Sequence, residues 1–293
     1  LGDVYKRQRE SRMRMRHKAL IFLSLLLYFL SLPTYAARYA SIIVDESTGT
    51  VLHAANPDSQ IYPASLTKMM TLYLIFEALE SKRLTLNTVL LTSRRAATRP
   101  ASRLGLKKGQ RLSVRQIIGA LVTKSANDAA TVIAEKLGGT EAGFAKIMTI
   151  RARQLGMART VFKNASGLPN RAQISTARDL AKLAMALRRN FPQHFHKFSM
   201  RKFRYRGQDF RNHNRLLRYY KGTDGIKTGY VRASGYNIAL SVQRSGHRLI
   251  ALVFGGKSAN RRDRHIKTLL RRVFKMLAEN DRLDSALSAQ GYN

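Results

Sequence analysis

Two kinds of hydrophobic spacing divide this sequence, and their order limits the folds that it can form. Apolar residues alternate or run without interruption over residues 38–54 and 236–254, which is typical of β-strands. Over residues 66–180 they recur every three or four positions, which is typical of helices that bury one face. Strands near both ends with helices between them predict an α/β (α+β) fold, in which helices cover one antiparallel sheet and form an inserted helical cluster.

Turn and capping residues divide the chain further. Ser113 with Gln116 has the spacing of a capping box, and Thr176 with Asp179 caps a later helix. From Lys197 onward the pattern changes to strands. A basic amphipathic helix is expected over residues 261–277. The predicted hairpins join residues 38–45 to 51–54 and residues 236–242 to 249–254, and other predicted helices begin near residues 65, 113, 128, 140 and 176.

The first 36 residues have the composition of a secretory leader. Basic residues precede an apolar run from Ala19 to Leu30, and Pro33 and the small Ala36 follow. Because this run is shorter than the ~20 residues of a bilayer-spanning helix, we expect cleavage after Ala36 rather than a retained anchor. We therefore expect a leader and signal peptide over residues 1–36, one domain over residues 37–280, a short polar tail over residues 281–293, and export to the periplasm or cell-wall space.

Basic residues dominate the charge of this chain. It contains 53 Lys and Arg but 17 Asp and Glu, a net charge of +36, and +31 remains once the seven basic and two acidic residues of the leader are removed. No acidic residue lies between Glu80 and Asp128. A protein this basic binds polyanions, and in an exported protein we expect anionic wall polymers or a membrane surface, not nucleic acid. For the acid-free stretch between Glu80 and Asp128, a solvated basic face is favoured over a specific binding patch.

Ser65-Leu66-Thr67-Lys68, at the start of the first predicted helix, contains a candidate nucleophile and a candidate base. Residues three apart lie on one helix face, so the Ser65 hydroxyl and the Lys68 amine are expected within hydrogen-bond reach. Free N–H groups at a helix N-terminus also favour negative charge developing there. The same spacing is common on exposed helices, so this motif alone does not establish catalysis.

Two further segments contain polar residues suited to the same chemistry. Ser125-Ala126-Asn127 occupies a short loop between two predicted helices, where a hydroxyl and an amide can transfer a proton and orient a peptide. Lys227-Thr228-Gly229 leads into the second hairpin. An ammonium beside a hydroxyl suits a carboxylate, and glycine lets a ligand approach a strand edge. Alone, Ser125-Ala126-Asn127 is better explained as an ordinary loop, and Lys227-Thr228-Gly229 alone is a plausible turn.

Together and in this order, the three motifs resemble the S-x-x-K, S-D-N and K-T-G patterns of penicillin-binding proteins and class A β-lactamases. The chain is most similar to the low-molecular-mass serine-type D-alanyl-D-alanine carboxypeptidases, peptidase family S11, over residues 38–277. This resemblance implies a DD-peptidase/β-lactamase-like fold and a catalytic domain that acts on peptidoglycan stem peptides. Beyond the three motifs, it is visible in residues 63–70, 164–168, 176–180, 212–217 and 224–230.

The resemblance also implies roles for single residues. Ser65 attacks the carbonyl between two D-alanines, Lys68 in its neutral form accepts the serine proton, and Ser125 relays a proton to the leaving amine. The backbone N–H groups of Ser65 and Tyr230 form the oxyanion hole, β-lactams inhibit covalently, and neither a metal nor a cofactor takes part. We expect a monomer. Substrate binding falls to Asn127, Lys227, Thr228, Gly229 and Tyr230, with Arg262 as a weaker match to a carboxylate-assisting arginine.

Alternative functions remain open from the sequence. A DD-endopeptidase that cleaves peptidoglycan cross-links acylates the same kind of serine as a DD-carboxypeptidase, so the motifs do not separate the two. A β-lactamase is disfavoured, because Ala126 replaces the usual Asp and residues 163–171 contain no glutamate to activate a deacylating water. An inactive wall-binding module is the non-enzymatic alternative, although binding alone does not require Lys68.

Overall fold

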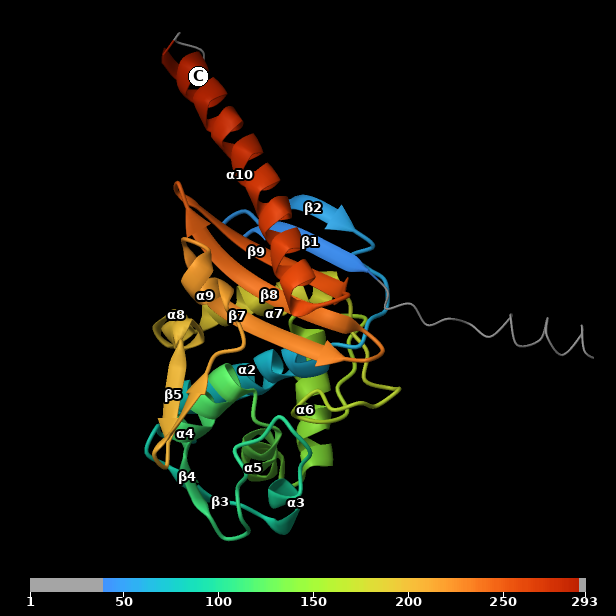
Figure 1. The fold of residues 1–293 in the computed structure, drawn as a ribbon, viewed down its shortest axis with the longest axis vertical. Coiled ribbons are helices and arrows are strands. Elements are labelled where there is room, and N and C mark those ends of the chain that lie inside the picture. Colours follow the sequence, from blue (N-terminus) through green and yellow to red (C-terminus); the bar gives the residue numbers. More distant parts are fainter. Residues whose placement is uncertain (1–38, 290–293) are drawn as a thin grey trace, which may run out of the picture. The chain divides into compact units, whose positions relative to one another are not determined.

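The two predicted hairpins form most of a five-stranded antiparallel sheet. Val, Ile, Leu and Phe are frequent in these strands, so apolar side chains project from both faces. In the computed structural model, which describes residues 39–289, the strand order is β2-β1-β9-β8-β7. β1 pairs with β9, so segments from opposite ends of the chain lie side by side (Figure 1). The strands are β1(Ala40–Asp45), β2(Val51–Ala55), β7(Thr223–Val231), β8(Gly235–Arg244) and β9(His247–Gly256).

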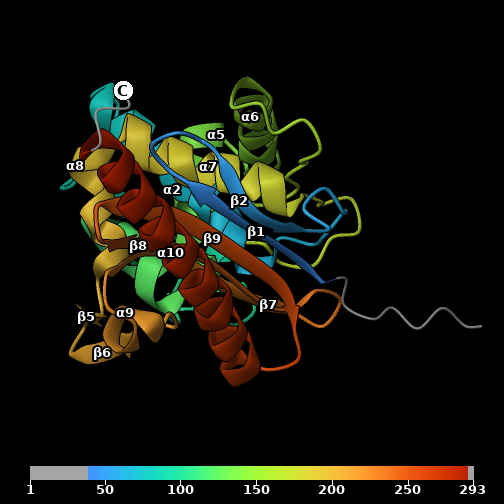
Figure 2. The same cartoon turned by 90° about the horizontal axis from the view of Figure 1, so that it is seen from above.

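Helices cover both faces of this sheet. On one face, Leu240 packs in a cluster with Ile266 and Leu270 of α10(Ala259–Ala289). On the other face, Leu252 belongs to the core that the remaining helices share. The sheet therefore lies between α10 and the helical cluster, as Figure 2 shows. This arrangement confirms the predicted antiparallel sheet covered by helices.

The helical cluster is built around α2(Lys68–Glu80), which follows the short helix η1(Ala64–Thr67). Ten of the 13 residues of α2 are buried, so the N-terminus of this helix is firmly fixed in the core. The other elements are β3(Val89–Leu91), α3(Arg94–Ala97), β4(Arg111–Ser113), α4(Val114–Gly119), η2(Ala120–Lys124), α5(Asn127–Gly138), α6(Glu141–Gln154), α7(Ala177–Asn190), α8(Pro192–Phe195), η3(His196–Ser199), β5(Lys202–Tyr205), β6(Gln208–Arg211) and α9(Leu216–Tyr219).

The predicted helix starts are confirmed by their caps. Ser113 Oγ accepts a hydrogen bond from Gln116 N at 3.2 Å, and Gln116 Oε1 accepts one from Ser113 N at 2.9 Å, which completes the capping box of α4. Thr176 Oγ1 accepts from Asp179 N at 3.0 Å at the start of α7. Such caps satisfy backbone N–H groups that the helix itself leaves unpaired.

Two predicted boundaries are wrong. The helix η3 occupies residues 196–199, so strand structure begins at Lys202 rather than Lys197. The last helix does not end at Leu277 but continues to Ala289, because no Gly or Pro interrupts residues 278–289 and ion pairs support the extension. Lys275 pairs with Glu279 at 3.7 Å, and His247 pairs with Asp281 at 3.1 Å.

Some predictions concern residues that the structure does not describe. The expected signal peptide over residues 1–36 and the end of the expected polar tail, residues 290–293, lie outside the described part of the chain. Within residues 39–289, no helix combines the length and the apolar composition that crossing a bilayer requires.

Candidate active site

All three sequence motifs meet at one cavity of about 680 Å³. Ser65 comes from η1, Ser125 from the link between η2 and α5, Asn127 from the first position of α5, and Thr228 from the edge strand β7. The lining residues are Ser65, Ala101, Ser102, Arg103, Lys124, Ser125, Asn127, Ser166, Gly167, Leu168, Pro169, His213, Thr228, Gly229, Tyr230, Val231, Arg232, Tyr236, Ala259 and Arg262. Two predicted site residues, Lys68 and Lys227, lie behind this lining and are buried.

Lys68 is the buried centre of the site. Its Nζ lies 3.4 Å from Ser65 Oγ, 2.7 Å from Asn127 Oδ1 and 2.5 Å from the main-chain oxygen of Ser166. A neutral amine has two N–H donors, and the Asn127 and Ser166 oxygens accept both. The remaining lone pair of Lys68 is therefore available to the Ser65 hydroxyl.

The surroundings of Lys68 favour this neutral form. Complete burial lowers the pKa of its amine well below the usual lysine value, and the charge of Lys227 lowers it further. The negative charges of Asp128 and Glu141 act in the opposite direction and are outweighed. The structure thus places an amine whose neutral form is favoured beside a hydroxyl that lines the cavity.

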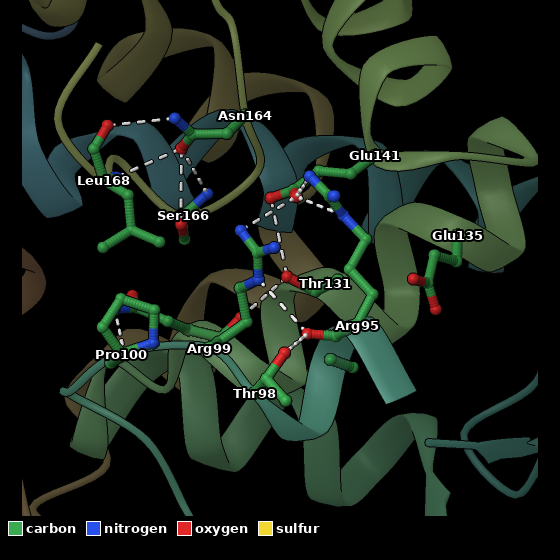
Figure 3. Close-up of polar contacts among 12 residues, drawn as sticks. Arg95, Thr98, Arg99, Pro100, Thr131, Glu135, Glu141, Asn164, Ser166 and Leu168 are labelled. Carbon is green, nitrogen blue, oxygen red and sulfur yellow. Dashed lines mark hydrogen bonds and ion pairs between the residues drawn. The ribbon is translucent and has the colours of Figure 1, made fainter. Parts of the chain in front are cut away.

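The carboxylates of Asp128 and Glu141 are themselves fully engaged. Asp128 accepts hydrogen bonds from the backbone N–H groups of residues 104, 105 and 106 at 2.9–3.1 Å. Glu141 pairs with Arg95 at 2.8 Å and with Arg99 at 3.5 Å, as Figure 3 shows. Asp128 therefore anchors a neighbouring backbone segment, and Glu141 balances the charges of two arginines. Neither carboxylate lines the cavity.

Asn164 shapes the turn whose Ser166 oxygen accepts from Lys68, and Figure 3 shows its contacts with Ser166 and Leu168. Its Oδ1 accepts from the backbone N–H groups of Ser166 at 3.2 Å, Gly167 at 2.7 Å and Leu168 at 3.1 Å. Its Nδ2 donates to the Leu168 oxygen at 3.0 Å. One side chain thus satisfies four main-chain groups and fixes the direction of the Ser166 carbonyl.

Gly167 allows this turn to approach η1 and Ser65 closely. Its φ of +85° lies in the left-handed region, and a Cβ at this position would lie 1.8 Å from the main-chain oxygen of Ala64. Only glycine therefore fits between the turn and η1.

The loop that carries Ser125 and Asn127 closes one side of the cavity. Ser125 has a φ of +59°, and its buried Oγ has no hydrogen-bond partner among the described residues. Asn127 Nδ2 donates to the Pro100 oxygen at 3.0 Å, which leaves its second N–H for other acceptors. Because Asn127 Oδ1 accepts from Lys68, Asn127 also positions that amine, a role that the sequence motif does not predict.

The edge strand β7 forms the other side. A Cβ on Gly229 would lie 3.0 Å from Ser65 N, so glycine lets the strand pack closely against the helix η1 that bears Ser65. Lys227 Nζ donates to the Thr228 oxygen at 2.8 Å. Burial, together with the charge of Arg262, lowers the pKa of Lys227 to about 7. Tyr230, 54% exposed, lies at the mouth, where its ring packs against Tyr236.

Arg262, the weaker sequence match, also reaches the cavity. It is 4% exposed, its Nη1 donates to the Asn237 oxygen at 3.1 Å, and its Nε donates to Asp263 Oδ1 at 2.9 Å. These contacts hold the guanidinium in one orientation at the wall. The structure therefore brings every predicted site residue to the cavity or directly behind it.

The structure adds site residues to which the sequence analysis gives no role. The resemblance includes residues 164–168, but nothing there indicates that a main-chain oxygen of Ser166 holds a lysine. His213 also lines the cavity, and burial with the charges of Lys227 and Lys124 lowers its pKa to about 4, so it is neutral near pH 7. Arg103 and Arg232 also line the cavity, but neither belongs to a sequence motif that would distinguish it from other surface arginines.

Comparison with known proteins relates this site to a family. The sequence model of the D-alanyl-D-alanine carboxypeptidases matches residues 30–258. D-alanyl-D-alanine carboxypeptidase DacF of Bacillus subtilis is 32% identical over 242 residues, which cover 79% of this chain and 60% of DacF. D-alanyl-D-alanine carboxypeptidase DacD of Escherichia coli is 34% identical over 237 residues, covering 78% of this chain and 61% of DacD.

A solved structure agrees with the sequence relatives. Penicillin-binding protein D2 of Listeria monocytogenes, in its ampicillin-bound form, is 31% identical and has a TM-score of 0.74. The match covers 83% of this chain and 100% of that one. This chain spans about 60% of the length of DacF and DacD. Sequence and fold point to the same relatives, and the chain belongs to the D-alanyl-D-alanine carboxypeptidase family, peptidase family S11.

Proposed function

We propose that this protein is a serine-type D-Ala-D-Ala carboxypeptidase that removes the terminal D-alanine from peptidoglycan stem peptides. The observation that carries this proposal is the buried Lys68, whose Nζ lies 3.4 Å from Ser65 Oγ and has acceptors for both N–H groups of its neutral form. A base in this state beside a serine is what nucleophilic activation requires. The names of DacF and DacD support a carboxypeptidase rather than an endopeptidase.

The reaction begins with acylation of Ser65. Its Oγ attacks the carbonyl carbon between the two D-alanines while Lys68 accepts the hydroxyl proton. The resulting oxyanion receives hydrogen bonds from the backbone N–H groups of Ser65 and Tyr230. The close packing of Gly229 against Ser65 N supports this pairing of donors.

Ser125 completes the first step by relaying to the leaving amine the proton that Lys68 accepted. Its buried Oγ has no partner among the described residues, so it is free to exchange a proton within the site. The C–N bond then breaks, D-alanine leaves, and water hydrolyses the ester to regenerate Ser65.

The terminal carboxylate of the substrate binds at Thr228, Arg262 and Lys227. The first two line the cavity, and Lys227 lies directly behind them. Because Lys227 and Arg262 repel each other, an incoming carboxylate stabilises both cations. The second N–H of Asn127 and the β7 backbone at Gly229 and Tyr230 hold the peptide itself.

Covalent inhibition by β-lactams follows from the same chemistry. The ampicillin-bound form of the Listeria protein supports acylation of this fold by a β-lactam. The proposed mechanism uses side chains and backbone groups alone, without a metal or an organic cofactor.

We further infer an exported monomer that works in the periplasm or cell-wall space. The order of basic, apolar and small residues before Ala36 supports a cleaved leader, followed by a catalytic domain over residues 37–280. The charge of +31 that remains after cleavage supports contact with anionic wall polymers or a membrane surface.

Replacing the nucleophile tests the proposal. Ser65→Ala should abolish both the release of D-alanine from a synthetic pentapeptide and covalent labelling by penicillin, with its fold retained. Intact-protein mass spectrometry with peptide mapping identifies the labelled residue, and Ser81→Ala, at the exposed end of α2, is the control. Near-normal turnover by Ser65→Ala would refute the mechanism. Purified cross-linked peptidoglycan, tested in parallel, should release D-alanine rather than separated strands.

A further inference from the structure

The cavity wall carries positive charge that the proposed reaction does not use. Arg103, Lys124 and Arg232 line the cavity, and none of the lining residues is Asp or Glu. Within the described part of the chain, none of these three cations is paired with a carboxylate. In a concave site, several unpaired charges of one sign produce a field that attracts the opposite charge.

Two of these cations are held on the side of the cavity that carries Ser125. Lys124 directly precedes Ser125, and its Nζ lies 5.5 Å from the centre of the Phe210 ring. Ser102 Oγ donates to the Lys124 oxygen at 2.7 Å, and Ser102 O accepts from Asn127 N at 2.7 Å. Because Arg103 follows Ser102, these bonds tie both Arg103 and Lys124 to the loop that holds the second motif.

The third cation lies beyond the end of β7. Arg232 lies in the turn that follows β7, four residues after Thr228, and both residues line the cavity. A peptide whose terminal carboxylate lies at Thr228 and which extends along the edge of β7 covers about 7 Å with its two D-alanines. The side chain of the preceding residue then reaches the region of Arg232.

We propose that Arg103, Lys124 and Arg232 form a subsite for an anionic side chain on the residue that precedes the two D-alanines. The subsite selects acidic peptides, in which this third residue from the C-terminus carries a side-chain carboxylate. The inference rests on the proposed function and adds a specificity to it. Electrostatic complementarity of this kind changes kcat/KM between substrates more than it changes the chemical step.

The test uses two synthetic peptides that end in D-Ala-D-Ala and differ at one group. The third residue from the C-terminus carries a side-chain carboxylate in one peptide and the corresponding carboxamide in the other. The wild-type kcat/KM should be higher for the acid. The ratio of kcat/KM for the acid to kcat/KM for the amide, the acid-to-amide ratio, should decrease as salt is added. Arg103→Gln and Arg232→Gln should each lower the ratio about threefold, and the double variant roughly tenfold, as expected for partly exposed ion pairs.

Arg115→Gln is the matched control, since Arg115 is exposed on α4, does not line the cavity and undergoes the same change of charge. It should keep the wild-type ratio. Equal wild-type rates on the two peptides would overturn the subsite and leave the proposed carboxypeptidase intact, whereas hydrolysis of neither would refute the proposed function itself. The salt dependence of the wild-type ratio tests the subsite without any variant.

An anionic wall polymer is the competing ligand for these cations. If Arg103→Gln and Arg232→Gln weaken retention on such a polymer but leave the acid-to-amide ratio unchanged, the cations serve the polymer and the subsite is refuted.

Discussion

Among single residues, Lys68 has the strongest link between burial and chemistry. Its pKa is held well below the usual lysine value, and only the neutral amine accepts the Ser65 proton, so acylation should slow as pH falls through this lowered pKa. Lys227→Met removes a neighbouring positive charge, which should raise the pKa of Lys68. The pH at which the acylation rate is half its maximum should therefore move to a higher value. Rates of penicillin acylation between about pH 5 and 9 give both midpoints. An unchanged or lower midpoint in the variant would contradict this account.

Lys227 should matter most for substrates with a free terminal carboxylate. Lys227→Ala removes a charge-assisted contact worth about 1.5–3 kcal/mol, so kcat/KM should fall roughly 10- to 100-fold on such peptides and much less on amidated analogues. Because the pKa of Lys227 is about 7, the preference of the wild type for a free carboxylate over its amide should be present below pH 7. This preference should decline as pH rises through that value. Equal losses of kcat/KM on the two substrates would show that Lys227 does not bind the terminal carboxylate.

The adduct formed by penicillin on Ser65 should be long-lived. Residues 163–171 contain no glutamate, and the acidic residues nearest Lys68 are engaged, Asp128 by backbone N–H groups and Glu141 by two arginines. Among residues 39–289, no carboxylate lines the cavity to activate a deacylating water. After a penicillin pulse, mass spectrometry should follow an adduct that persists far beyond one turnover. Rapid loss with an excess of hydrolysed penicillin would indicate a β-lactamase instead.

At the level of elements, the turn over residues 164–168 must fit against η1. Gly167→Ala places a Cβ against the Ala64 oxygen, so we expect the turn to shift and the Ser166 carbonyl to leave Lys68. Acylation should slow at least tenfold, and unfolding free energy should fall by about 1–3 kcal/mol. Thermal unfolding and penicillin labelling measure the two effects.

Gly109→Ala separates backbone strain from steric conflict. Gly109 has a φ of +78°, close to that of Gly167, but a Cβ there meets nothing within 4 Å. This variant should lose only the roughly 1 kcal/mol that left-handed backbone costs a non-glycine residue and keep its acylation rate. If both variants acylate normally, the contact between the turn and η1 has no role in positioning Lys68.

Elements set by local patterns were predictable, whereas contacts between distant segments were not. The caps at Ser113 and Thr176 follow from residues three positions apart, so the sequence alone indicates them. The hydrogen bond from Lys68 to Ser166 joins residues 98 positions apart through a main-chain oxygen, which every residue possesses. The motif residues were predictable because a resemblance named them, while the Ser166 carbonyl has no side-chain pattern to reveal it.

The molecule as a whole should bind polyanions in a salt-dependent way. Residues 37–293 carry +31, and Coulomb attraction between exposed charges is screened over about 10 Å at 0.1 M salt. The protein should be retained by anionic vesicles or purified anionic wall polymer at low salt and released as salt rises. Neutral vesicles are the control. Retention that does not depend on salt would indicate an apolar contact instead.

The cavity around Ser65 is built from three segments that the chain supplies in succession: η1, the loop before α5, and β7. Gly229 packs against Ser65 N only when the C-terminal hairpin has joined the sheet, so an incompletely folded chain lacks part of the site. Under the proposed mechanism, covalent labelling by a β-lactam should therefore count native molecules. In a refolding experiment, the labelled fraction of a preparation should rise in step with the last event that completes the sheet, and not with the earlier recovery of helix content.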